Sequence, residues 1–225
     1  MQMLDQTVTT VEDSGLRSFF TDVFMRMTAA LAVSAGFAGI ASTMPFLYTG
    51  GLLTWLIILS PLAFVLAMSL GSERFSTNTI VLMFFGFAIT QGLSMGSIFI
   101  VFTGASIITA FLIASAVFAT FAVLGYTTKR DLTSMGTFLF VGLIGIIIAS
   151  VVNIWLALPA LAATINVLAV LIFVGLTAYD VQMLKNVYYS GGDTGKARTL
   201  GALSLYLDFI NIFISLLQLI GVKRD

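Results

Sequence analysis

Seven long apolar stretches dominate this chain, at residues 27–48, 52–71, 80–102, 105–126, 136–158, 162–184 and 201–222. Each stretch is 20 to 23 residues long, which in a helix rising 1.5 Å per residue crosses a hydrocarbon core of about 30 Å. Transmembrane β-strands would instead read as ~10-residue segments of alternating polarity. The sequence therefore predicts an all-α polytopic membrane protein with seven transmembrane helices.

The amino-acid composition also indicates a membrane protein without a separate soluble domain. The 225 residues are 59% hydrophobic and 9% charged, whereas soluble domains average about 45–50% and about 25%. We expect one membrane domain over residues 27–222, preceded by a tail at 1–26 with an amphipathic lead-in and followed by a tail at 223–225. Ten Lys and Arg balance ten Asp and Glu, so the net charge gives no reason to expect a nucleic-acid partner.

Two residue types are absent. The chain has no Cys and no His, which excludes thiol nucleophiles, iron–sulfur clusters, serine–histidine relays, imidazole zinc sites and ordinary haem ligation. We therefore expect neither a cofactor nor an enzyme activity. The titratable chemistry that remains belongs to carboxylates, Lys, Arg and Tyr.

The cations are distributed unevenly over the two membrane faces. If all seven stretches cross, the face that holds the N-terminus receives eight of them: Arg17, Arg26, Arg74, Lys129, Arg130, Lys185, Lys196 and Arg198. The opposite face receives Lys223 and Arg224. The positive-inside rule predicts a cytoplasmic N-terminus and an external C-terminus, here in a bacterial inner membrane. A re-entrant last segment would put all ten cations inside, but residues 203–220 lack helix breakers, which favours a full crossing.

Small residues indicate where helices pack closely. Gly92 and Gly96 in the third stretch, and Ala35 and Gly39 in the first, have the spacing that lets two helix backbones approach. We expect these four positions to pack against neighbouring helices.

Two acidic residues lie inside apolar stretches. Eighteen of the twenty charged residues lie outside the seven stretches, and the exceptions are Asp180 in the sixth and Asp208 in the seventh. A charge at a helix centre costs about 2.5–3.5 kcal/mol on insertion scales. Asp180 is about 6 Å and Asp208 about 10 Å from the cytoplasmic ends of their stretches, which a single short connection joins. The two side chains can therefore meet.

Such a pair supports two interpretations. Two carboxylates within hydrogen-bond reach in a low dielectric share one proton and titrate together, so that losing the proton turns attraction into repulsion. This describes a pH-sensitive latch between two helices, whose oxygens could hold a hard cation such as Ca²⁺ weakly and transiently. The other interpretation is a neutral, hydrogen-bonded structural pair. Residues alone leave both open.

Arg74 is the third charged candidate. It follows the second stretch, and its long guanidinium could reach a carboxylate in the cytoplasmic half of the membrane. The alternative is a cation that sets the topology and extends to lipid headgroups.

Four motifs resemble one known family. TAYDVQML at 177–184 and ALSLYLDFINIF at 202–213 resemble the signature of the Bax inhibitor-1 family, also called the transmembrane Bax inhibitor motif family. TTKRDLTSMGTFL at 127–139 and NIWLALPAL at 153–161 resemble its bacterial branch. The likeness extends from about residue 16 to the end.

The resemblance implies a fold, a function and a set of site residues. The fold would have six helices around a central seventh, and the function would be a pH-sensitive calcium leak channel. Asp180 and Asp208 would be its proton sensor, with Arg74, eighteen residues before Gly92, as the latch. Bacterial relatives are also linked to a membrane-bound quality-control protease, so a non-channel regulator that binds such a protease is the alternative. The oligomeric state is not determined by the sequence.

An intramembrane aspartyl protease is a weaker alternative. That class also carries one Asp on each of two neighbouring helices, the first preceded by Tyr as in Tyr179-Asp180. Its second motif requires Gly-x-Gly before the Asp, where this chain has Leu205, Tyr206 and Leu207. Without those glycines, a substrate backbone could not approach closely.

Overall fold

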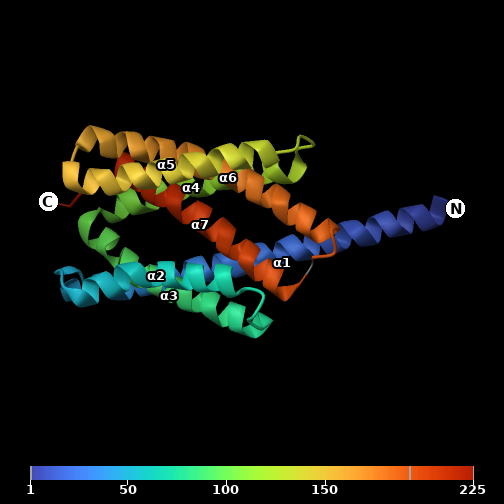
Figure 1. Cartoon of the computed structure of the whole chain (residues 1–225), viewed down its shortest axis with the longest axis horizontal. Helices are drawn as coiled ribbons and strands as arrows, with labels where there is room; N and C mark the ends of the chain where they lie inside the picture. The colour runs from blue at the N-terminus through green and yellow to red at the C-terminus, as the bar shows by residue number, and fades with distance from the viewer. Residues whose placement is uncertain (1, 193, 225) are drawn as a thin grey trace. The chain divides into compact units, whose positions relative to one another are not determined.

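Seven α-helices make up almost the whole chain (Figure 1). The computed structural model describes residues 2–192 and 194–224, with side chains from residue 14 onward. Within these residues there is no β-strand. The elements are α1 (Gln2–Ser42), a 3₁₀ turn η1 (Pro45–Tyr48), α2 (Leu52–Gly71), α3 (Thr77–Val101), α4 (Gly104–Thr127), α5 (Thr133–Leu156), α6 (Pro159–Tyr189) and α7 (Gly195–Ile220).

All seven helices are long and apolar enough to cross a membrane, which confirms the predicted fold class. Burial separates the last helix from the rest. In its apolar window α7 is 67% buried, whereas the other six windows are 11–28% buried. The C-terminal helix is therefore the one covered by protein, in agreement with the central position that the resemblance implies.

The first helix begins earlier than the first apolar stretch. α1 starts at Gln2, and its candidate span covers Ser14–Ser42 rather than 27–48. The amphipathic lead-in belongs to this helix because Leu16, Phe19 and Val23 recur at helical spacing and are all buried. The lead-in and the first span thus form one continuous helix.

Local chemistry sets the two ends of α5. Before its first turn, Asp131 Oδ1 accepts the Thr133 N–H at 2.9 Å. At its other end Ala157 adopts a left-handed conformation, with φ of 49°, and the Leu158 N–H donates to Asn153 Oδ1 at 3.0 Å. Pro159 then begins α6, where its missing N–H and fixed φ are tolerated.

The helices fall into two compact units. Unit 1 comprises Met1–Gly96 and Leu184–Leu203, and unit 2 comprises Ser97–Met183 and Ser204–Asp225. In unit 1, a Cβ at Gly92 would overlap the backbone of Ser34, and the Ser34 hydroxyl donates to the Ala88 carbonyl at 2.7 Å. The close packing expected at Gly92 is therefore present between α1 and α3.

The small-residue face expected on the first stretch was wrong. Ala35 is exposed and Gly39 has open space beside it. Ser34 and Phe37 of α1 contact Gly92, and Ala41 of α1 contacts Gly96. The spacing of small residues was the same on both faces, but burial selects the face that carries Ser34, Ala38 and Ala41.

In unit 2, the chain that follows α7 is tied to the connection between α3 and α4. The Thr103 N–H donates to the Val222 carbonyl at 3.0 Å, and the Arg224 N–H donates to the Val101 carbonyl at 2.8 Å. Because α4 begins at this connection, the last helix ends at the same end of the unit as α4 starts. Together with the unbroken run Gly195–Ile220, this supports a full crossing by α7.

Candidate functional site

The two intramembrane aspartates lie on adjacent helices of unit 2. The Ser204 hydroxyl on α7 donates a hydrogen bond to Asp180 Oδ2 on α6. Ser204 is one helical turn before Asp208, so both side chains occupy the same face of α7. The structure thus brings the two predicted residues together through Ser204.

Asp208 is the more buried of the two. Its side chain is 4% exposed, and its Oδ2 has no hydrogen-bond partner among the described residues. Thr177, one turn before Asp180 on α6, lies beside it, but the Thr177 hydroxyl donates to the Phe173 carbonyl at 2.8 Å. Asp180 is the charged group that acts on Asp208 through space. The pair is therefore coupled and incompletely hydrogen-bonded.

Two glycines fix the turn of α6 that carries Asp180. A Cβ at Gly125 of α4 would overlap the carbonyl of Ala178, and one at Gly136 of α5 would overlap the ring of Tyr179. Such contacts hold α6 against both neighbours at backbone distance. Asp180 is thus presented to α7 from a turn packed on α4 and α5.

Gln182 ties the same turn to the α4–α5 connection. Its Oε1 accepts the Leu132 N–H at 2.8 Å, and its Nε2 donates to the Arg130 carbonyl at 2.8 Å. A buried amide that satisfies both of its ends in this way fixes a loop to a helix. Gln182 belongs to the TAYDVQML motif, but only its position two residues after Asp180 could have drawn attention to it.

Aromatic packing fixes the turn of α7 that carries Asp208. The Phe209 ring contacts Phe118 and Phe111 of α4 edge-on, with centroids 5.7 Å and 5.4 Å apart. Phe213, one turn further, also contacts Phe111, at 6.2 Å. Both aspartates therefore stand on turns that α4 holds in place.

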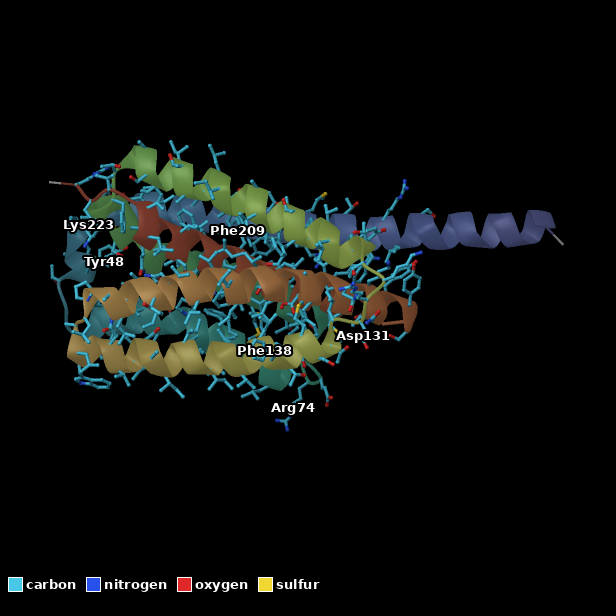
Figure 2. All side chains as sticks on the ribbon, turned by 90° about the horizontal axis from the view of Figure 1, so that it is seen from above. Tyr48, Arg74, Asp131, Phe138, Phe209 and Lys223 are labelled. Carbon is cyan, nitrogen blue, oxygen red and sulfur yellow. The ribbon has the colours of Figure 1, made fainter. Side chains whose placement is uncertain are left out.

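Arg74 lies in unit 1, in the connection between α2 and α3, and its side chain is exposed. Figure 2 shows the guanidinium pointing away from the ribbon. Its backbone N–H donates to the Gly71 carbonyl at 2.9 Å. The latch between Arg74 and the aspartate pair stays a prediction.

Unit 1 holds the first turns of α7 by an ionic network that the sequence analysis missed. Asp22 of α1 pairs with Arg26 at 3.0 Å and with Arg198 of α7 at 3.3 Å. Arg26 also donates to the Thr199 hydroxyl at 2.7 Å. In addition, Lys196 donates to the Ser72 carbonyl at 3.1 Å. Several of the cations from which the orientation was predicted thus make specific contacts.

The arrangement limits what the site can hold. Two carboxyl groups supply oxygen ligands, and no group of three or more His, Cys, Asp or Glu that could bind a metal occurs among the described residues. A tightly bound divalent ion needs six or more oxygens. The chemistry that these residues support directly is the gain, loss and sharing of a proton.

The seven helices define a polytopic membrane protein, with two aspartates in the apolar stretches of α6 and α7 as its candidate site. The chain matches the family model described as inhibitor of apoptosis-promoting Bax1 over residues 16–225. It belongs to this Bax inhibitor-1 family.

Curated relatives match almost the whole chain. The inner membrane protein YbhL of Escherichia coli strain K12 is 40% identical over 220 residues, covering 94% of each chain. An uncharacterized protein of Caulobacter vibrioides is 38% identical, covering 95% of this chain and 92% of the relative. An uncharacterized protein of Borreliella burgdorferi is 36% identical, covering 99% and 100%.

Proposed function

We propose that the chain is a pH-sensitive cation leak of the bacterial inner membrane, passing Ca²⁺ down its gradient. Asp180 and Asp208 form the proton-dependent gate, and Arg74 is its latch. The membrane location follows from the seven spanning helices and from the similarity to an E. coli protein that is named for the inner membrane.

One observation carries the proposal: Asp208 Oδ2 is buried beside a second carboxyl group and has no hydrogen-bond partner among the residues that the structure describes. A buried polar atom left unpaired is costly, and an unpaired buried charge is more so. One proton shared by the pair relieves this cost, and its loss leaves two like charges in a low dielectric. The two helices then repel at this turn.

The groups that face the pair supply no competing charge. From α6 they are Asp180 and Thr177, and from α7 they are Ser204 and Asp208. Neither carboxylate forms an ion pair with a cation among the residues that the structure describes. The proton on the pair is therefore the charge that decides how the two helices interact.

The test is calcium flux into liposomes that contain the purified protein and a calcium dye, measured across a pH series. Wild-type protein is expected to leak Ca²⁺ at a rate that depends on pH. Asp180→Asn combined with Asp208→Asn should make the rate independent of pH. Asp131→Asn, an exposed acid on the α4–α5 connection (Figure 2), is the control and should keep the wild-type profile.

Two results would contradict this function. One is wild-type liposomes that leak no faster than protein-free liposomes. The other is a double Asn variant that keeps the wild-type pH profile. If Arg74 is the latch, Arg74→Gln should raise the flux at the pH where wild-type protein leaks least, while Arg17→Gln should not.

The protease interpretation finds a physical obstacle at α7. Leu205 and Leu207 stand where an aspartyl protease needs glycines, and Leu205 is fully buried. Two leucines at these positions deny a substrate backbone the close approach that glycines would allow. Binding to a quality-control protease is a separate matter, and co-purification with such a protease from membranes with normal calcium handling would favour it over the leak.

A further inference from the structure

Five polar side chains follow one face of α7. Their spacings alternate between four and three residues, the repeat that keeps side chains on one side of a helix. They are Ser204, Asp208, Asn211, Ser215 and Gln218. The stripe runs through the largely apolar part of α7 that follows Leu203, from the carboxyl pair almost to the C-terminal end of the helix.

Two hydrogen bonds show that this stripe follows α6. At one end Ser204 contacts Asp180, and at the other Asn166 Nδ2 donates to Gln218 Oε1 at 3.0 Å. The two contacts are separated by 14 residues on α6 and by 14 residues on α7, which is a rise of about 21 Å along each helix. The two antiparallel helices therefore keep one register, and the intervening polar residues of α7 lie along the seam between them.

Interhelical bonding does not account for the middle of the stripe. Asn211 Nδ2 donates to the Leu207 carbonyl of its own helix at 2.8 Å. Opposite, in the same register, α6 presents Phe173 and Ala169, which are buried and apolar. The amide at 211 therefore does not bind α6 to α7, although polar residues in membrane helices most often serve that purpose.

Polar side chains that face the interior of a membrane protein mark the routes of ions and water. We propose that the polar seam, meaning the face of α7 from Ser204 to Gln218 together with Asp180 and Asn166 of α6, is the route by which the cation passes through unit 2. The Asn166–Gln218 hydrogen bond, which is exposed, closes the mouth of this route at its far end as an uncharged second gate. This inference rests on the proposed leak function.

The two ends of the seam differ in chemistry. Carboxyl groups at Asp180 and Asp208 respond to protons, whereas the side-chain amides of Asn166 and Gln218 do not titrate. A passing cation can replace the amide hydrogen bond by binding the Gln218 carbonyl oxygen. The far gate therefore affects how fast ions pass but not the pH at which the near gate responds.

The first experiment uses Asn166→Leu and Gln218→Leu in the liposome assay. Gln218→Leu should lower the calcium flux by about tenfold, because it removes the oxygen that the cation binds, whereas Asn166→Leu removes the closing hydrogen bond and should raise the flux. Neither variant should move the midpoint of the pH profile. Val167→Leu is the control, because residue 167 is the neighbouring exposed apolar position on α6, and it should keep the wild-type rate. If the calcium flux is unchanged in both Asn166→Leu and Gln218→Leu, the proposal that the polar seam is the cation route is wrong.

A second experiment does not depend on how the leucine variants fold. The chain has no Cys, so a variant with Asn166→Cys and Gln218→Cys carries thiols only at the far gate. A bifunctional thiol reagent with a cleavable disulfide spacer should abolish flux when it joins the two sites, and reductant should restore it. Each single Cys variant, treated in the same way, should still leak.

If the cross-linked double Cys variant leaks at the rate of the untreated variant, the proposed second gate is wrong. This failure is distinct from failure of the leak function itself. If pH-dependent flux survives in the double Asn variant of Asp180 and Asp208, the aspartate gate is wrong. If that variant loses its pH dependence while the far-gate variants leak normally, only the seam is wrong.

Discussion

The Ser204 hydroxyl of α7 donates a hydrogen bond to the Asp180 carboxylate of α6. Ser204 thereby links the two acidic turns, since it belongs to the same face of α7 as Asp208. A serine with a single hydroxyl proton can stabilise only one of the two carboxyl groups. The pair is thus asymmetric: Asp180 has a donor, and Asp208 Oδ2 has none among the described residues.

Replacing Ser204 should move the pH response of the leak. A hydroxyl donor favours the ionised carboxylate, so Ser204→Ala favours the protonated pair and should move the midpoint of the flux profile to higher pH by about one unit. Ser204→Thr keeps a hydroxyl and should keep the midpoint. An unchanged midpoint in Ser204→Ala would show that this hydrogen bond does not influence the gate.

Loss of the Gln182 amide should loosen the α4–α5 connection. Gln182→Ala removes two hydrogen bonds and leaves the Leu132 N–H and the Arg130 carbonyl without them, at a cost of about 1–2 kcal/mol in unfolding free energy. We expect a lower thermal midpoint and faster hydrogen exchange of the Leu132 amide. Asn186→Ala, at an exposed position one turn along α6, should change neither.

Two glycine substitutions should have opposite effects on stability. Gly125→Ala places a Cβ into the carbonyl of Ala178 and forces α4 and α6 apart, at about 1–3 kcal/mol. Gly145→Ala on α5 has nothing within 4 Å of the new Cβ, so better helix propensity should stabilise it by about 0.5–1 kcal/mol. Thermal unfolding in detergent measures both, and equal effects would contradict the packing described here.

Asp131 should give the start of α5 its own pH dependence. Hydrogen bonds from the Thr133 side chain and backbone hold the pKa of Asp131 below its ordinary 3.8. A lowered folded pKa means that the stabilisation is complete above the unfolded value and is lost as pH falls through the folded one. Hydrogen exchange of the Thr133 amide should therefore be slower in wild-type protein than in Asp131→Ala near neutral pH. In acid the two rates should become equal.

Much of the fold could be predicted because a helix that crosses a lipid bilayer needs about 20 consecutive, mostly apolar residues. Seven apolar runs became seven helices, and the two charges inside them proved to lie on adjacent helices in contact through Ser204. Depth along each helix was enough for this, since one short connection joins α6 and α7. The roles of Asp180, Asp208 and Arg74 remain predictions.

The rest depends on rotation and on contacts that apolar patterns do not encode. Ala35 with Gly39 and Gly92 with Gly96 have the same spacing, but only the second pair lies at a helix contact. Gln182 and Asn166 are two of several polar residues in α6, and their partners at Arg130, Leu132 and Gln218 follow from the register of packed helices. A single sequence does not give that register.

The chain end beyond α7 restricts how the last helix can move. Thr103 and Arg224 donate backbone hydrogen bonds across the α3–α4 connection, and the Val222 N–H donates to the Ser106 hydroxyl at 2.9 Å. A piston stroke of α7 along its axis would break all three bonds at once. A tilt that pivots on this anchored end would keep them and displace the helix most at its other end, where it would have to break the contacts of Lys196, Arg198 and Thr199 with Ser72, Asp22 and Arg26. If Asp208 gates the leak as proposed, we expect α7 to tilt as a rigid helix about its C-terminal end, so that displacement increases toward the carboxyl pair.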